Sequence, residues 1–486
     1  SDRFNNRIQK WIPGASSGVT VAGGNGANSG SNQLNYPNGV YVDGAGNMFV
    51  TDRYNSRIQK FTLNDFSLSN TSTGTYYVRA TAANGCAVTS TSVTVTSVTP
   101  VITGNPCEGS TLSANAGNGV TQLQWFYNNN PVSSPGVVYD TYATTVAGGA
   151  GYGSASDQLA EPTGLCVDGS GNIYVSDYFN HRIQKWAPGA TSGVTVAGGN
   201  GSGSAANQLY SPKGVSVDAN GNIYICDYEN HRVQKWAPGA TSGVTVAGGN
   251  GPGSAANQFY YPTGLYVDGA GNVYVSDYNN YRVQKWAPGA TTGVTVAGGN
   301  DYGSAANQLI FPNGVTVDSY GNVYVCDYVN HRIQKWAPGA TSGVTVAGGN
   351  GYGNEPNQLY YPEGVYVDGF GNVFVCDSYN HRIQKWAPGA SVGETVAGGY
   401  GYGSESNQLY NTNGVALDLY GNIYVCDKYN YRVQKFSMNL NNTLPNVVPG
   451  TYTVTATNMN GCTGTSQPFT VAQSTTSTTS VSINSS

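Results

Sequence analysis

Residues 262–286 read PTGLYVDGAGNVYVSDYNNYRVQKW, and this stretch decides the fold. Two apolar runs flank the turn Gly269–Asn272, a pattern typical of a β-hairpin. Arg282–Trp286 predicts a third strand, and Gly293–Ala297, which follows the turn at Pro288-Gly289, predicts a fourth. The stretch therefore predicts one small sheet of four short strands.

This unit recurs every fifty residues, and a fixed period of this size is typical of repeat architectures. The strands are apolar at consecutive positions, which indicates sheets covered on both faces. Each copy opens with an acidic or amide residue, Gln and then Leu or Phe. The six openings are Asp157-Gln158-Leu159, Asn207-Gln208-Leu209, Asn257-Gln258-Phe259, Asn307-Gln308-Leu309, Asn357-Gln358-Leu359 and Asn407-Gln408-Leu409.

The patterns Pro-x-Gly-Val-x-Val-Asp, Gly-Asn-x-Tyr-Val-x-Asp and Asn-His-Arg-Ile-Gln-Lys-Trp resemble the NHL repeat in all six copies. The resemblance implies an all-β chain with a six-bladed β-propeller over residues 139–436. The sixth copy ends at Phe436 without a Thr-Val-Ala-Gly-Gly strand, and Thr144–Gly149 supplies that sequence ahead of the first copy. We expect this strand to complete the last blade and close the ring.

Length and composition limit the class of protein and its partners. A chain of 486 residues exceeds a single core, so at least two domains are expected. Only 10% of residues are charged and 67 are Gly, which is typical of a turn-rich all-β surface protein. The net charge of -5 argues against nucleic acid as a partner. No apolar stretch approaches the roughly 20 residues of a membrane span.

The N-terminal region is a second copy of the C-terminal region. Residues 1–61 repeat the signature of 376–436 but amount to partial propeller blades. Asp43 matches Asp418, an offset of 418 − 43 = 375. Residues 62–98 in turn match the segment that follows the propeller. This longer period predicts a tandem arrangement, in which residues 1–98 are completed by neighbouring modules or subunits.

The segments around the propeller resemble the Ig-like (PKD/Ig-type) modules of bacterial surface proteins. Residues 62–98 resemble the closing half of such a module, and 99–138, with Trp125, resemble the opening half. The resemblance implies that 99–138 and 437–473 form one discontinuous Ig-like β-sandwich into which the propeller is inserted, with a Cys107–Cys462 disulfide.

A competing arrangement pairs residues 72–98 with 99–138 as a permuted module. In that arrangement Cys107 bridges Cys86 instead of Cys462. In the first arrangement residues 1–98 need a partner, which is either an upstream part of a longer tandem protein or a neighbouring subunit, and both of these possibilities imply a fibre or array. The chain continues to a Ser/Thr-rich tail at 474–486.

Two sets of recurrent residues, one of Asp and one of Cys, suggest metal binding, but each set has a structural explanation. One set precedes Gly-rich turns whose N–H groups an Asp side chain satisfies; it comprises Asp168, Asp218, Asp268, Asp318, Asp368 and Asp418. The other set occupies a strand position at which two blades have Ser176 and Ser276 instead, which indicates a site for a small side chain. It comprises Cys226, Cys326, Cys376 and Cys426. Cys166 is expected to be a packing residue as well.

His and Arg also recur at fixed positions. We expect polar rim residues rather than zinc ligands at His181, His231, His331 and His381. We expect pairing with the Asp177-type residues for Arg182, Arg232, Arg282, Arg332, Arg382 and Arg432. No cofactor-binding, metal-binding or catalytic residue is assigned.

Tyrosines recur in loops that a propeller places on one face. Tyr with Gly, Ser and Asn is the chemistry of adaptable recognition surfaces, and it suits glycans or another protein. An equally weighted alternative is that many of these rings only cap the interfaces between blades. The candidate binding face comprises Tyr178, Tyr228, Tyr278, Tyr328, Tyr379, Tyr429, Tyr302, Tyr352 and Tyr402.

Some NHL-like propellers are lyases or metal-dependent hydrolases, but an active site must break the symmetry of a ring. Since the blades are nearly identical, we expect no enzyme. The sequence favours an extracellular or cell-surface bacterial protein that assembles with copies of itself into a fibre. The alternative is a surface adhesin that binds glycans or other surface proteins without polymerising. Asn70, Asn441 and Asn484 match the glycosylation pattern.

Overall fold

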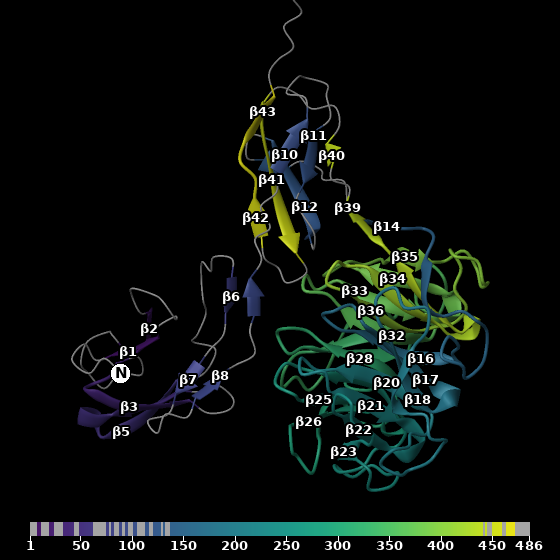
Figure 1. Cartoon of the computed structure of the whole chain (residues 1–486), viewed down its shortest axis with the longest axis horizontal. Helices are drawn as coiled ribbons and strands as arrows, with labels where there is room; N and C mark the ends of the chain where they lie inside the picture. The colour runs from purple at the N-terminus through teal and green to yellow at the C-terminus, as the bar shows by residue number, and fades with distance from the viewer. Residues whose placement is uncertain are drawn as a thin grey trace, which may run out of the picture. The chain divides into compact units, whose positions relative to one another are not determined.

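The computed structural model describes residues 137–440 without interruption. Outside that range it describes the segments 7–10, 19–23, 33–42, 48–61, 74–76, 79–81, 87–89, 93–95, 101–104, 112–115, 120–127, 130–131, 443–444, 450–458 and 463–471. Strands dominate these residues, and their helices are single 3-10 turns (Figure 1). None of the helices in the described part could cross a membrane. The chain divides into two compact units, Ser1–Ser97 and Val98–Ser486.

The first unit contains short antiparallel sheets. One is a three-stranded sheet with the register of a propeller blade, in which Pro37 pairs with Asp52. Its strands are β3 (Pro37–Val42), β4 (Met48–Asp52) and β5 (Arg57–Phe61). The other pairs are β1 (Arg7–Lys10) with β2 (Val19–Gly23), β6 (Gly74–Tyr76) with β9 (Val93–Val95), and β7 (Arg79–Thr81) with β8 (Ala87–Thr89).

The second unit contains a six-bladed propeller, in which every blade is a four-stranded antiparallel sheet. Blade 1 is β16 (Pro162–Val167), β17 (Ile173–Asp177), β18 (Arg182–Trp186) and β19 (Val194–Gly198). Blade 2 is β20 (Pro212–Val217), β21 (Ile223–Asp227), β22 (Arg232–Trp236) and β23 (Val244–Gly248). Blade 3 is β24 (Pro262–Val267), β25 (Val273–Asp277), β26 (Arg282–Trp286) and β27 (Val294–Gly298). Blade 4 is β28 (Pro312–Val317), β29 (Val323–Asp327), β30 (Arg332–Trp336) and β31 (Val344–Gly348). Blade 5 is β32 (Pro362–Val367), β33 (Val373–Asp377), β34 (Arg382–Trp386) and β35 (Glu394–Gly398).

Blade 6 joins two distant parts of the chain. It consists of β36 (Thr412–Leu417), β37 (Ile423–Asp427), β38 (Arg432–Phe436) and β15 (Thr144–Gly148). Thr145 pairs with Gln434, and its hydroxyl donates to Gln434 Oε1 at 2.9 Å. The predicted closure of the ring is confirmed, and the first strands contact one another in the closed cycle β16–β20–β24–β28–β32–β36–β16.

The core of the propeller lies between adjacent blades. Between blades 3 and 4, for example, Trp336 is 1% exposed and belongs to one cluster with Tyr274, Leu309 and Val325. The first strands approach closely around the axis. A Cβ on Gly214 would lie only 2.6 Å from the carbonyl oxygen of Thr263 in the next blade, which explains the Pro-x-Gly pattern.

Segments before and after the propeller form two further sheets together. In one, β11 (Leu112–Asn115) pairs with β10 (Val101–Gly104) and β40 (Thr443–Leu444). In the other, β12 (Val120–Tyr127) pairs with β13 (Asn130–Pro131) and β41 (Gly450–Asn458), and β41 pairs with β42 (Thr463–Thr465) and β43 (Phe469–Val471). Where the chain enters and leaves the propeller, β14 (Val137–Tyr139) pairs with β39 (Met438–Leu440).

Candidate functional site

A buried carboxylate holds the turn between the second and third strands of each blade. In blade 4, Asp327 accepts hydrogen bonds from the backbone N–H of Ile310 at 2.8 Å and from Asn330 Nδ2 at 2.9 Å. Arg332 Nε donates to the same carboxylate at 2.7 Å. The equivalent pair occurs in every blade at 2.7 or 2.8 Å. The predicted pairing of the recurrent arginines is confirmed.

The histidines of this turn connect neighbouring blades. Nδ1 of His331 accepts a hydrogen bond from the backbone N–H of Tyr361 at 3.2 Å. Tyr361 has a φ of 51°, in the left-handed region that bulky residues seldom adopt. His181, His231 and His381 accept the same bond at 3.1 or 3.2 Å. The sequence predicted that these histidines are polar rim residues, and it did not predict their hydrogen bond to the next blade.

The Asp168-type residues belong to the turns on the opposite face. Asp268 Oδ1 accepts the backbone N–H groups of Ala270 at 3.0 Å and Asn272 at 2.8 Å, and the other five turns repeat these contacts. Cys226, Cys326, Cys376 and Cys426 are buried and not disulfide-bonded. Burial raises the pKa of the Cys226 thiol. Both sets have the structural roles that the sequence predicts.

The structure separates the predicted turn tyrosines into two sets. Tyr178, Tyr228, Tyr278 and Tyr328 directly follow the buried Asp and are half-buried. Three of these rings stack on an aromatic neighbour with centroids 4.7 Å apart. The pairs are Tyr228 with Tyr261, Tyr278 with Phe311, and Tyr328 with Tyr361. Tyr379 and Tyr429 stand one residue later and are exposed. Ser378 and Lys428 take the place after Asp in blades 5 and 6.

Two lines of tyrosines, which we call the tyrosine tracks, lie on this face at blades 5 and 6. In the first, the ring of Tyr360 lies 5.4 Å from that of Tyr352 and 5.2 Å from that of Tyr379. In the second, the ring of Tyr410 lies 5.5 Å from that of Tyr402 and 5.0 Å from that of Tyr429. Tyr352 and Tyr402 are 68% and 69% exposed.

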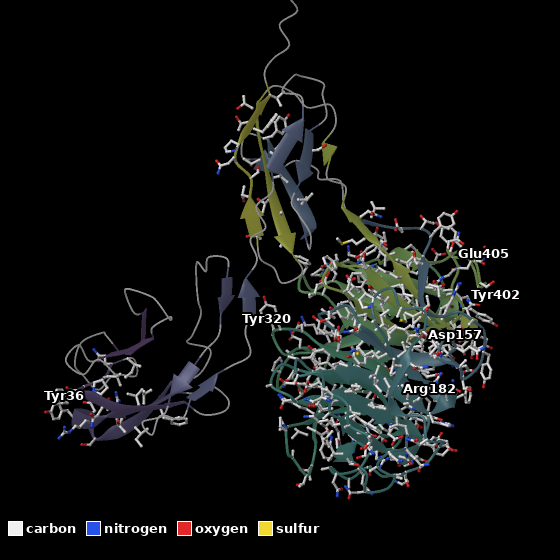
Figure 2. All side chains as sticks on the ribbon, in the orientation of Figure 1. Tyr36, Asp157, Arg182, Tyr320, Tyr402 and Glu405 are labelled. Carbon is white, nitrogen blue, oxygen red and sulfur yellow. The ribbon has the colours of Figure 1, made fainter. Side chains whose placement is uncertain are left out.

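The tracks are confined to two blades. Tyr302 is also exposed and lies 5.7 Å from Tyr281, but Ile310 and Val329 stand where a track in blade 4 would need tyrosines. Tyr402 lies on one side of the propeller and Tyr320, in a turn of the opposite face, lies on the other (Figure 2).

A second group of side chains surrounds the propeller axis on the face of the tracks. Pro312 pairs with Asp327, so the beginnings of the first strands lie beside these turns. We call this region the axial mouth. The second residues of the first strands, which line it, are Thr163, Lys213, Thr263, Asn313, Glu363 and Asn413. Because β20 and β32 are three places apart in a cycle of six, Lys213 and Glu363 lie on opposite sides of the axis.

The charges at this axial mouth are only partly paired. Lys428 Nζ lies 3.3 Å from Glu161 Oε2. Lys213 Nζ lies 4.1 Å from the ring centroid of Tyr228 and 5.8 Å from that of Tyr278. Burial lowers the pKa of Lys213 to about 8, although Glu363 opposes the shift. Burial raises the pKa of Glu363, against the effects of Lys428 and Lys213.

Sequence reasoning missed the axial mouth. It treated the blades as nearly identical, which is correct for the strands and wrong at these positions. The signal was present in the variable residue of Pro-x-Gly, which is Lys only at 213 and Glu only at 363 within blades 1 to 5. Recognising that Lys213 and Glu363 face each other also requires the number of blades and the closure of the ring.

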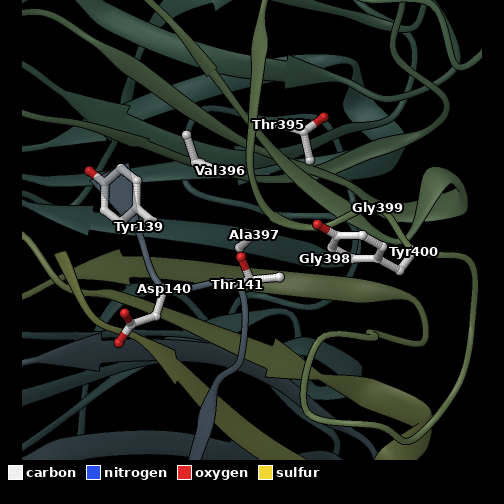
Figure 3. Close-up of a pocket in the computed structure, with 9 residues that line it drawn as sticks. All are labelled: Tyr139, Asp140, Thr141, Thr395, Val396, Ala397, Gly398, Gly399 and Tyr400. Carbon is white, nitrogen blue, oxygen red and sulfur yellow. The ribbon is translucent and has the colours of Figure 1, made fainter. Parts of the chain in front are cut away.

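A cavity of about 290 Å³ lies away from the axis, at the outer strand of blade 5 (Figure 3). Asp140 and Thr141 line it together with Thr395 and Tyr400. Asp140 N–H donates to the Ser437 carbonyl at 2.8 Å, so this is the place where the chain enters and leaves the propeller. The cavity is a feature of that junction.

Several predicted residues lie outside the part of the chain that the structure describes. These are the candidate disulfide cysteines Cys107 and Cys462, the alternative Cys86, and the candidate glycosylation sites Asn70, Asn441 and Asn484. Among the described residues, no cluster of three or more His, Cys, Asp or Glu side chains is arranged to hold a metal ion.

The fold and the repeated turn define the class of protein as a six-bladed β-propeller. The NHL repeat model matches residues 34–61, 159–186, 209–236, 259–286, 309–336 and 359–386. Five of these segments are the first three strands of blades 1 to 5, and the sixth is the sheet β3–β4–β5. The chain therefore contains six NHL repeats, and its propeller is of the NHL type. Blade 6, in which Thr412 replaces the proline, lies outside the matches.

Solved structures with a similar fold include enzymes and a protein of unknown function. The latter, from Bacteroides thetaiotaomicron, is 13% identical with a TM-score of 0.49, over 85% of this chain and 100% of that one. A gluconolactonase from Xanthomonas campestris is 13% identical with a TM-score of 0.44, over 63% and 99%. An inactive variant of virginiamycin B lyase from Staphylococcus aureus is 9% identical with a TM-score of 0.37, over 62% and 99%. With TM-scores below 0.5, these likenesses carry no argument about activity. No curated protein matches the chain.

Proposed function

We propose that the propeller is a non-catalytic binding module of an extracellular protein, and that the tyrosine tracks bind an extended glycan. The observation that supports this proposal is the lines of adjacent rings at blades 5 and 6, whose ends are exposed. Tyr side chains offer a flat apolar face and a polar hydroxyl at a low cost in conformational entropy. A chain of sugars has matching C–H faces and hydroxyl groups along its length. These groups recognise a ligand rather than react with it.

A glycan array probed with the whole chain tests this function. Tyr352→Ala combined with Tyr402→Ala is expected to abolish the signal of the wild-type chain, because each substitution removes the exposed end of a track. Tyr302→Ala is the matched control, since Tyr302 occupies the same loop position in a blade without a track. Tyr320→Ala controls for the opposite face. Equal signals from the track variant and both controls would refute the proposal.

We also propose that the propeller is carried in a discontinuous Ig-like sandwich and that such units assemble in series at the surface of a bacterium. The pairing of β12 with β41 and of β11 with β40 supports the sandwich. The second blade-like sheet, β3–β4–β5, supports a repeating arrangement because it carries the same buried ion pair, Asp52–Arg57, at 2.8 Å. Electron microscopy of native material is expected to show linear repeats, and a field of dispersed monomers would contradict this assembly.

A further inference from the structure

The axial mouth contains two opposite charges without direct partners. Within the described residues, the Glu363 carboxylate and Lys213 Nζ form no hydrogen bond and no ion pair, and Lys213 Nζ lies over the rings of Tyr228 and Tyr278. The two groups lie on opposite sides of the axis and form no ion pair with each other. Both charges are partly removed from water, which is unfavourable unless a partner compensates.

The surroundings of these charges decide which ligand would compensate them. A simple cation attracted by Glu363 would be repelled by Lys213 and Lys428. A simple anion attracted by Lys213 would be repelled by Glu363 and Glu161. A ligand that carries one charge of each sign can satisfy both positions. The half-buried rings of Tyr278 and Tyr328, on which the charge of Glu363 acts, add aromatic faces that favour the ammonium group of such a ligand.

We propose that the axial mouth binds a small zwitterion of the amino-acid class, with the ligand carboxylate on Lys213 and the ligand ammonium on Glu363. This site is separate from the tyrosine tracks, so it does not depend on glycan binding. Lys428, in the neighbouring blade, is paired with Glu161 at 3.3 Å. Its positive charge also lowers the pKa of Glu363, against the effect of burial.

Calorimetric titration of the whole chain with glycine, β-alanine and 4-aminobutyrate tests the proposal. These probes increase the separation of the two charges stepwise, and we expect at least one to bind. Acetate and methylammonium carry one charge each and are expected to bind at least about tenfold more weakly than the best zwitterion. Lys213→Met and Glu363→Gln are each expected to weaken that zwitterion by a similar factor.

Matched variants separate binding from a structural role of the two charges. Lys235 is on the third strand of blade 2 and Glu394 on the fourth strand of blade 5, so Lys235→Met and Glu394→Gln are expected to leave the affinity unchanged. Lys213→Arg keeps the positive charge and is expected to retain binding, which keeps the test valid even when Lys213→Met does not fold. The proposal is overturned if none of the three zwitterions binds at millimolar concentration, or if the folded Lys213→Met and Glu363→Gln variants bind them as the wild-type chain does.

Discussion

At the scale of single residues, removing one partner of the buried ion pair in a blade is expected to be strongly destabilising. Asp327 is 0% exposed and has Arg332, Asn330 and the Ile310 N–H as partners. Asp327→Ala would leave the Arg332 guanidinium without its carboxylate. Such a change is expected to lower the free energy of unfolding by about 3–5 kcal/mol. Chemical denaturation measures it, with the exposed Asp301→Asn as the control. Equal unfolding curves for Asp327→Ala and the control would contradict this role.

The inter-blade histidines predict how stability depends on pH. Burial lowers the pKa of His231, His331 and His381 below the ordinary 6.5, and it does so for His181 against the charges of Asp177 and Asp227. A base with a lowered pKa in the folded state contributes stability that is present above pH 6.5 and lost as the pH falls through the folded-state value. The melting temperature is therefore expected to fall between pH 7 and pH 5.

Tyr281 and Tyr431 occupy the histidine position in blades 3 and 6, and they suggest the control for this pH effect. A chain with all four histidines replaced by Tyr is expected to show a flatter dependence of melting temperature on pH over the same range. An unchanged slope would show that other groups cause the dependence.

Lys213 predicts a pH dependence of ligand binding at the axial mouth. Its pKa is about 8 because of burial, and the charged groups that act on it are Glu363, Lys428 and Glu229, together with the Cys226 thiol. The affinity for the best-binding zwitterion is expected to fall as the pH rises through about 8, since the ammonium that holds the carboxylate is lost. Calorimetry from pH 6 to 9 measures this. Lys213→Arg stays charged over the range and is expected to remove the fall; a fall of the same size in that variant would contradict the assignment.

At the scale of elements, we expect the closing strand β15 to be more sensitive to substitution than the corresponding strands of the other blades. Ala147 is 3% exposed within the core between blades 6 and 1. Ala147→Asp would bury an unpaired charge and release a strand that no direct turn joins to its partner β38, since the two are held near each other by the β14–β39 pair. Amide hydrogen exchange over residues 432–436 is expected to increase strongly.

The matched variant for this prediction is Ala247→Asp in blade 2. It has the same chemistry, but β23 follows its partner β22 directly in the chain and so re-forms after local opening. Exchange over residues 232–236 is expected to rise much less than over 432–436 in Ala147→Asp. Equal increases in the two variants would show that closure adds no special sensitivity.

The elements of the propeller follow from the sequence because each blade repeats the same local signals. The turn Gly269–Asn272, the strand Arg282–Trp286 and the stray strand at Thr144 were sufficient to predict the sheets and their closure. The tyrosine tracks were only partly predictable. Tyr352 and Tyr379 are linked by the ring of Tyr360, which lies between them, and the backbone next to Tyr360 has an unusual left-handed conformation at Tyr361.

The axial mouth was not predictable from local patterns. Lys213 and Glu363 are 150 residues apart, and their opposition depends on the geometry of the whole ring. A repeat analysis averages over the blades and so removes the positions at which they differ. Departures from the repeat are therefore a better guide to candidate sites in this propeller than the repeated residues themselves.

At the scale of the whole molecule, the propeller is suited to insertion in another domain. Its entry and exit strands are paired, with Val137 opposite Leu440, so the chain leaves the ring where it entered. A domain with adjacent ends can be inserted without separating the strands of its host. The pairing of β12 with β41, in which Trp125 lies opposite Val454, joins the two parts of such a host.

This arrangement predicts which cysteines are linked. Because β11 and β12 pair with β40 and β41, we expect Cys107 to be joined to Cys462 rather than to Cys86. Peptide mapping under non-reducing conditions measures the linkage, and the buried Cys226 and Cys326 are internal controls that should be recovered as thiols. A disulfide across so long a loop would restrict the unfolded chain strongly, so reduction is expected to destabilise the sandwich. Recovery of a Cys86–Cys107 peptide would instead mean that the N-terminal unit supplies the missing strands, and the inserted arrangement would have to be abandoned.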